Sequence, residues 1–227
     1  MELKTIGTIH TDFAEKFGIP RQSGLVEELR GTIVMEKEYR NPDAFRGLEE
    51  YSHIWLLWQF SRAEARPAAV TVRPPRLGGN QRRGVFATRS PFRPNGIGLS
   101  CVRLVSIEQD RQLGPVLHVA GADLLDGTPI YDIKPYLPYT DAHPDAAGGF
   151  AERVQGHSLR VECPAELLKK VAADKQKALL GVLAQDPRPA YQEDPNREYG
   201  LSFAGYQLRF RVDGDCLFVL SLSSDRV

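Results

Sequence analysis

The sequence predicts a mainly β fold over its first two-thirds and a small α+β unit after it. Before residue 137, seven short segments rich in β-branched and aromatic residues alternate with turn signals. No helix-length amphipathic segment lies between them, so the spacing favours a barrel or a sandwich over βαβ units. A stretch rich in Pro, Gly, Ala and Asp then separates the two parts. We therefore expect a β domain over 1–140, a linker over 141–157 and an α+β domain over 158–227.

The strands expected in the first part have the lengths and β-branched content typical of such elements. They are 3–11, 32–36, 53–60, 84–89, 99–109, 116–124 and 128–136. The segment 53–60, HIWLLWQF, is apolar on both faces and predicts a central strand, with Trp55 and Trp58 in the core. Asn41 before a proline predicts a short helix over 42–48, because Asn caps helices and Pro opens them.

The second part predicts a helix among strands. A strand is expected over 158–162, and Pro164 then opens a helix that must end before the next prolines. Two further strands, over 201–212 and 216–222, are joined by an Asp-Gly turn at 213–214, a strong hairpin signal.

Composition excludes several classes of protein. A chain of 227 residues with 42% hydrophobic residues is long enough to bury a real core. Its three cysteines, Cys101, Cys163 and Cys216, are far apart, which fits neither a disulfide framework nor a zinc site. We expect reduced thiols and no metal. No apolar run reaches about 18 residues, and the first residues lack a signal-peptide core, so we expect a cytoplasmic protein with no membrane segment.

Glycine motifs argue against the common nucleotide-binding folds. Gly96 and Gly98 match the start of G-x-G-x-x-G, but Cys101 occupies the third small position and no strand–turn–helix context surrounds them. No Gly-Lys-Ser/Thr sequence occurs, so a P-loop is absent. Any nucleotide-like cofactor must therefore be bound by irregular loops.

The arginine content of one segment suggests a polyanionic partner. Residues 65–107 contain eight arginines and no Asp, Glu or Lys, although the net charge of the chain is zero. Arginine suits bidentate phosphate contacts and stacking on bases, and these arginines alternate with Phe86 and Phe92. The pattern favours a surface that follows phosphates, and a solvated charged face is the alternative.

Other candidate residues have both structural and functional interpretations. Residues 20–22, Pro-Arg-Gln, form a turn or part of a site, and His53 is more often structural in such a strand. The segment 126–136, DGTPIYDIKPY, starts with a turn but also suits ribose hydroxyls, a cationic group and a stacked base. The loop 186–191, DPRPAY, ends a helix and also suits RNA contact through Arg and Tyr.

Six blocks taken together resemble one family. They are IPRQSG (19–24), GLEEYSHIWLLWQF (47–60), RPPRLGG (73–79), GVFATRSPFRPNGIGLS (84–100), DLLDGTPIYDIKPY (123–136) and QDPRPAY (185–191). In this order they resemble the TsaA/TrmO-like (YaeB-like) tRNA methyltransferases. The resemblance implies a non-Rossmann β-barrel that uses S-adenosylmethionine, followed by an additional C-terminal domain. The implied reaction is N6-methylation of the threonylcarbamoyl-modified adenosine beside the anticodon of threonine tRNA. The implied assembly is a homodimer with the cofactor near the subunit interface.

The resemblance also assigns residues by position. The implied cofactor-binding residues are Pro20, Arg21, Gln22, His53, Ser61, Arg89, Leu99, Asp126, Gly127 and Thr128. Many relatives carry His where this chain has Ser61, which weakens the assignment of that side chain. The implied substrate-binding residues are Arg73, Arg76, Arg93, Lys134, Tyr136, Arg188 and Tyr191. We expect Arg89 and Leu99 to face the methyl donor and Arg93 to face outward to RNA.

Methyl transfer from a sulfonium needs no metal and depends mainly on orientation. Some group should accept a hydrogen bond as charge develops on the attacking nitrogen, and Asp132 or Asp126 is a candidate. We also expect one Arg or Lys to pair with the carboxylate of the threonylcarbamoyl group. Two alternatives stay open: a non-catalytic RNA-binding module, and a methyltransferase of the same fold with another substrate.

Overall fold

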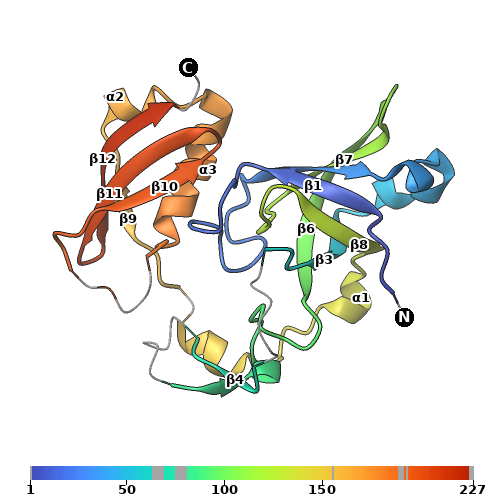
Figure 1. The fold of residues 1–227 in the computed structure, drawn as a ribbon, viewed down its shortest axis with the longest axis horizontal. Coiled ribbons are helices and arrows are strands. Elements are labelled where there is room, and N and C mark those ends of the chain that lie inside the picture. Colours follow the sequence, from blue (N-terminus) through green and yellow to red (C-terminus); the bar gives the residue numbers. More distant parts are fainter. Residues whose placement is uncertain are drawn as a thin grey trace.

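A β-barrel, a second β-sheet domain and a two-stranded ribbon make up the protein (Figure 1). The computed structural model describes residues 2–62, 69–74, 81–154, 156–188, 192 and 194–224. Within these residues, no helix is long and apolar enough to cross a membrane. In Figure 1 the barrel and the C-terminal sheet stand side by side, and the ribbon lies below them.

Six antiparallel strands close the barrel in the order β1-β2-β7-β6-β3-β8. Their bounds are β1 (Gly7–Thr11), β2 (Arg30–Met35), β3 (His53–Gln59), β6 (Ile97–Asp110), β7 (Gly114–Ala120) and β8 (Thr128–Pro135). Closure leaves no unpaired edge in this sheet. The interior is filled by aliphatic side chains such as Ile9, Ile33, Leu56 and Ile130, which are fully excluded from solvent. The predicted mainly β fold is confirmed, and it takes the form of a barrel.

Strand β3 differs from its prediction. Its side chains alternate between the core and the outer face, because one side of a barrel strand faces outward. Trp58 is in the core as expected, but Trp55 lies half-buried on the outer face. The indole N–H of Trp55 donates a hydrogen bond of 2.9 Å to Asp141. The expectation that both tryptophans are core residues is therefore wrong for Trp55.

Three-residue and four-residue turns replace two predicted elements. The segment 84–89 is not a strand: β5 (Arg83–Gly84) pairs only with β4 (Thr71–Val72), and a 3-10 turn, η5 (Val85–Ala87), follows. The helix expected over 42–48 is split into η2 (Pro42–Phe45) and η3 (Leu48–Glu50), because Gly47 adopts a φ of 85° between them. The predicted cap is confirmed, since the Asn41 side chain accepts a hydrogen bond from the Asp43 N–H.

Short helical turns also occur outside the two sheets. They are η1 (Lys37–Tyr39), α1 (Pro138–Asp141) and η6 (Gly149–Val154). The last one lies within the segment expected to be a linker. The guanidinium of Arg83 in β5 lies 6.0 Å from the ring of Phe150, so this turn contacts the ribbon.

The C-terminal domain is a four-stranded sheet in the order β10-β11-β12-β9 with two helices. Its elements are β9 (Arg160–Glu162), α2 (Ala165–Leu168), α3 (Ala173–Ala184), β10 (Tyr199–Phe203), β11 (Tyr206–Asp213) and β12 (Cys216–Ser224). The single helix expected after Pro164 is interrupted, because Val171 turns into the core between α2 and α3. The strand expected over 201–212 is a hairpin, since Ala204 and Gly205 both adopt positive φ.

The long loop between β1 and β2 joins the two domains. Phe13, Val26 and Leu29 of this loop are buried in the hydrophobic core of the C-terminal domain. The ring of Phe13 meets that of Phe203 edge-on at 5.4 Å. The loop is therefore packed against the C-terminal domain along much of its length, and it reaches the barrel at both ends.

Candidate functional site

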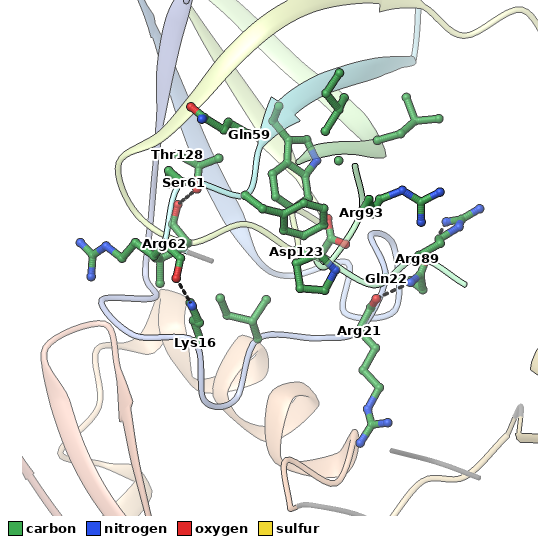
Figure 2. Close-up of a pocket in the computed structure, with 18 of the residues that line it drawn as sticks. Lys16, Arg21, Gln22, Gln59, Ser61, Arg62, Arg89, Arg93, Asp123 and Thr128 are labelled. Atoms are coloured by element: carbon green, nitrogen blue, oxygen red, sulfur yellow. Dashed lines mark hydrogen bonds between the residues drawn. The ribbon is translucent and has the colours of Figure 1, made fainter. Parts of the chain in front are cut away.

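A cavity of about 460 Å³ lies at one end of the barrel, within the range of small-molecule sites. Four segments line it: the β1–β2 loop, the end of β3, the loop into β6, and the β7–β8 loop (Figure 2). Its lining residues are Lys16, Ile19–Gln22, Trp58–Arg62, Thr88, Arg89, Pro91, Arg93, Ile97–Leu99, Asp123, Leu125 and Thr128.

The barrel topology brings these segments together. Strands β3 and β6 run antiparallel with Trp58 opposite Gly98, so the end of one and the start of the other lie at the same end of the barrel. Thr128 begins β8, the other neighbour of β3, and is only 2% exposed. The rings of Trp58 and Phe60 contact edge-on, with centroids 4.4 Å apart. These aromatic groups give the cavity an apolar wall.

A hydrogen-bonded chain connects this wall to a carboxylate. The indole N–H of Trp58 donates to Ser100 Oγ at 2.9 Å, and Ser100 Oγ donates to Asp123 Oδ1 at 2.6 Å. Because an indole N–H can only donate, the Ser100 hydroxyl proton is directed to Asp123. Burial raises the pKa of Asp123, and this effect outweighs the lowering by the Ser100 hydrogen bond and by the Arg89 charge.

Sequence reasoning did not assign Asp123 to the site. The available signal was its position between Ala122 and Leu124, both buried, where an acidic residue interrupts an apolar run. A perturbed carboxyl in a cleft is a common feature of functional sites.

Cationic side chains line the same cavity as this carboxyl. Arg89 donates a hydrogen bond to the side-chain oxygen of Gln22, and this pair joins the β1–β2 loop to the loop before β6 (Figure 2). Arg93 Nη1 donates to the carbonyl of Thr88 at 2.6 Å. Lys16 donates to the carbonyl of Arg62. Among the residues that the structure describes, no group of three or more His, Cys, Asp or Glu side chains is arranged to hold a metal ion.

Residues 8–142 match the model of the tRNA-methyltransferase O N-terminal domain, and residues 157–225 match that of the TrmO C-terminal domain. The chain belongs to the tRNA-methyltransferase O (TrmO) family. It is 41% identical to the tRNA (adenine(37)-N6)-methyltransferase of Escherichia coli K12, over 93% of each chain. It is 46% identical to a putative S-adenosylmethionine-dependent methyltransferase of Pseudomonas aeruginosa, over 86% of each chain. A crystal structure of TrmO from the same species superposes with a TM-score of 0.79 at 35% identity and covers 99% of both chains.

Seven of the ten expected cofactor-binding residues of this TrmO-family chain lie around the cavity. They are Pro20, Arg21, Gln22, Ser61, Arg89, Leu99 and Thr128. The other three are not among its lining residues. His53 lies at the opposite end of β3, where its ring is 6.2 Å from that of Tyr136. Asp126 Oδ1 accepts a hydrogen bond from the Thr11 N–H at 3.0 Å, and Gly127 adopts a φ of 75° in the turn before β8.

The two aspartates expected to take part in catalysis lie outside the cavity. Asp132 pairs with Leu57 and Ile130 pairs with Trp58, so Tyr131 is an extra residue in a β-bulge. Simple alternation from Thr128 would point Asp132 inward, but the bulge places it on the outer face. There it forms a 2.9 Å ion pair with Lys134.

The expected substrate residues are dispersed. Arg93 lines the same cavity as Arg89 and Leu99, whereas the sequence-based expectation separated it from them and turned it outward. Arg73 is exposed next to β4, and Tyr136 packs on Trp55 of the outer barrel face with centroids 5.8 Å apart. Arg188 Nε donates to Asp186 Oδ1 at 2.9 Å in the C-terminal domain. Arg76 and Tyr191 lie outside the described residues.

Proposed function

We propose that this protein is an S-adenosylmethionine-dependent methyltransferase that methylates N6 of the adenosine at position 37 of tRNA. The observation that carries the proposal is the cavity at the end of the barrel, where the Pro20–Gln22 segment, Arg89, Leu99 and Thr128 converge. Family membership supports the class of reaction, since relatives that match over most of this chain are named for this methyl transfer.

The lining suits such a donor chemically. S-adenosylmethionine supplies an activated methyl group on a sulfonium, together with an adenine ring and an amino-acid end. Trp58 and Phe60 offer an aromatic wall for a flat ring. Arg89, joined to Gln22, offers guanidinium donors that suit a carboxylate. The protein would thus act mainly by orienting the donor and excluding water from it.

The substrate that we propose is the threonylcarbamoyl-modified adenosine of threonine tRNA. Exposed arginines of the ribbon, including Arg73 and Arg82, lie on segments that lead into the cavity loop and suit the phosphates of an anticodon loop. One Arg or Lys near the cavity would pair with the carboxylate of the threonylcarbamoyl group. The test compares methyl transfer to threonine tRNA with and without this group. Equal rates would contradict the pairing.

We also propose a homodimer that uses the outer barrel face beside the cavity. Leu57 and Leu99 are directly paired neighbours on this face, and Leu99 is 51% exposed although it also lines the cavity. A partner there would cover this leucine and complete the wall of the donor site. Leu57→Arg should convert the protein to a monomer in light scattering and should weaken donor binding. A wild-type protein that is monomeric at high concentration contradicts this proposal.

The decisive experiment measures donor binding. Calorimetry with S-adenosylmethionine should detect binding to the wild type and loss of binding in Arg89→Ala, with Arg111→Ala as an arginine control in the distant β6–β7 hairpin. Arg188→Ala should mainly weaken tRNA binding. A non-catalytic RNA-binding module would bind no donor, and donor at 100 times its Kd would then fail to give the expected stabilisation of about 2.7 kcal/mol. Mass spectrometry of tRNA nucleosides from cells that lack the protein identifies the modified nucleoside.

A further inference from the structure

Cationic side chains outnumber carboxylates around the cavity. Five of the described lining residues are cationic, and Asp123 is the single carboxylate among them. The five are Lys16, Arg21, Arg62, Arg89 and Arg93. Figure 2 shows Asp123 amid the lining, with Arg89 and Arg93 to one side and Lys16 and Arg62 to the other. A ligand in the cavity is therefore in a field of positive charge that Asp123 alone offsets.

The carboxylate is held in one orientation. Ser100, which is 1% exposed, donates to Oδ1 and is itself fixed by the Trp58 indole. The backbone N–H groups of Asp123 itself and of Ser23 also lower its pKa. Hydrogen-bond donors of this kind favour the charged form of a carboxyl group, as does the nearby Arg89 charge. Burial has the larger effect and raises the net pKa of Asp123, so a positive charge on a bound ligand would favour the ionised carboxylate at the cavity wall.

The proposed donor carries the matching charge. Its amino-acid end is a zwitterion whose ammonium and carboxylate offset each other, so the sulfonium is its one uncompensated charge. A sulfonium has no N–H or O–H to donate, so a protein recognises its charge through groups of negative potential, such as a carboxylate, carbonyl oxygens or an aromatic face. Among the described lining residues, Asp123 is the one carboxylate. Asp123 lines the same cavity as the aromatic wall, and the Ser100 hydroxyl links it to the Trp58 indole through hydrogen bonds of 2.9 and 2.6 Å.

We infer that Asp123 is the counter-charge for the sulfonium of the methyl donor, so that the cavity selects the charged donor over the neutral thioether that remains after transfer. This inference rests on the proposed function. Methyl transfer removes the positive charge, and with it the attraction to Asp123. The residue thus favours binding of the donor before the reaction and release of the product after it.

The test compares three ligands on the full-length protein by calorimetry: S-adenosylmethionine, S-adenosylhomocysteine, and sinefungin, which has a protonated amine in place of the sulfonium methyl. Asp123→Asn should weaken the two charged ligands about tenfold or more beyond any loss for the thioether. Asp174→Asn, an exposed carboxyl at the start of α3, should leave all three affinities unchanged. Ser100→Ala keeps the Asp123 carboxylate but removes the hydrogen bond that orients it. This variant should also reduce the preference for the charged ligands over the thioether, by a smaller factor than Asp123→Asn.

The outcomes separate this inference from the proposed function. If the wild type binds none of the three ligands, the proposed function fails. If the wild type binds them and Asp123→Asn weakens all three by the same factor, or none, the charge-selection role is overturned and donor binding stands. A thermal unfolding transition like that of the wild type establishes that the variant is folded.

Discussion

The indole of Trp58 lies directly over Gly98 on the neighbouring strand of the barrel. The two residues are paired in register between β3 and β6, and both line the cavity. A Cβ atom at position 98 would lie far inside van der Waals contact with the six-membered part of the indole. The wall of the cavity therefore depends on the absence of a side chain at residue 98.

Gly98→Ala should displace the Trp58 indole and disturb its hydrogen bond to Ser100. We expect a loss of about 1–3 kcal/mol in the free energy of unfolding, typical of overpacking, together with weaker donor binding. Gly96→Ala is the matched control, because its Cβ would meet no atom within 4 Å. Urea denaturation and calorimetry on both variants provide the measurement. Similar losses at the two positions would contradict the role of the indole contact.

Gly18 should be the more sensitive of two loop glycines. Gly18 and Gly24 both adopt positive φ, of 91° and 78°, so alanine is strained at either position. A Cβ at residue 18 would also collide with Leu201 of the C-terminal domain, whereas one at residue 24 meets nothing within 4 Å. Gly18→Ala should therefore loosen the β1–β2 loop that supplies Pro20–Gln22 and should weaken donor binding. Gly24→Ala should reduce stability by about 1 kcal/mol and bind the donor nearly normally. Equal donor affinities in the two variants would show that the domain contact does not position the loop.

Asp186 should stabilise the C-terminal domain in a pH-dependent way. Burial alone would raise the pKa of Asp186, but hydrogen bonds from Arg188 and His157 outweigh burial, and the net pKa is lowered. A lowered pKa means that this stabilisation is present above the ordinary aspartate pKa and is lost as pH falls through the folded-state value. Asp186→Asn should lower the free energy of unfolding by about 2 kcal/mol at pH 7. The difference from the wild type should disappear at acidic pH.

A second substitution at position 186 separates the effect of the carboxylate charge from the effect of backbone strain. Asp186 has a φ of 51°, a conformation that Asn tolerates far better than Ala. Asp186→Ala should therefore be less stable than Asp186→Asn at every pH. Thermal unfolding from pH 3 to pH 8 measures both effects. A pH-independent deficit for Asp186→Asn would contradict the electrostatic explanation.

The ionised carboxylate of Asp123 should reduce the free energy of unfolding. Its pKa is raised, mainly by burial, so the folded state binds the proton of this carboxyl more tightly than the unfolded chain does. Stability is then lost as pH rises through the folded-state pKa. Asp123→Asn should match or exceed the wild type in melting temperature at pH 8, and this advantage should vanish at acidic pH. A variant that melts clearly below the wild type at pH 8 would indicate that the carboxylate is needed for folding.

The fold class and the family of this protein could be predicted from short strand patterns and from the order of the sequence blocks. Short β-branched segments predicted the mainly β fold, and the Asn41 cap was correct, because such features depend on neighbours in sequence. The order of the six blocks indicated the TrmO family, to which the chain belongs. The Pro20–Gln22 segment, Arg89 and Leu99 were also singled out, and they lie around one cavity.

The tertiary structure decided which acidic residue faces that cavity. Asp123, Asp126 and Asp132 lie within one short segment, and sequence reasoning favoured the last two. A single-residue bulge in β8 turns Asp132 outward, and a hydrogen bond from Thr11 holds Asp126 in the turn. Ser100 and Trp58, distant in sequence, come together only when β3 and β6 pair, and they hold Asp123 at the cavity wall. Register, bulges and contacts between distant strands arise only when the barrel closes, so a local pattern in the sequence does not contain them.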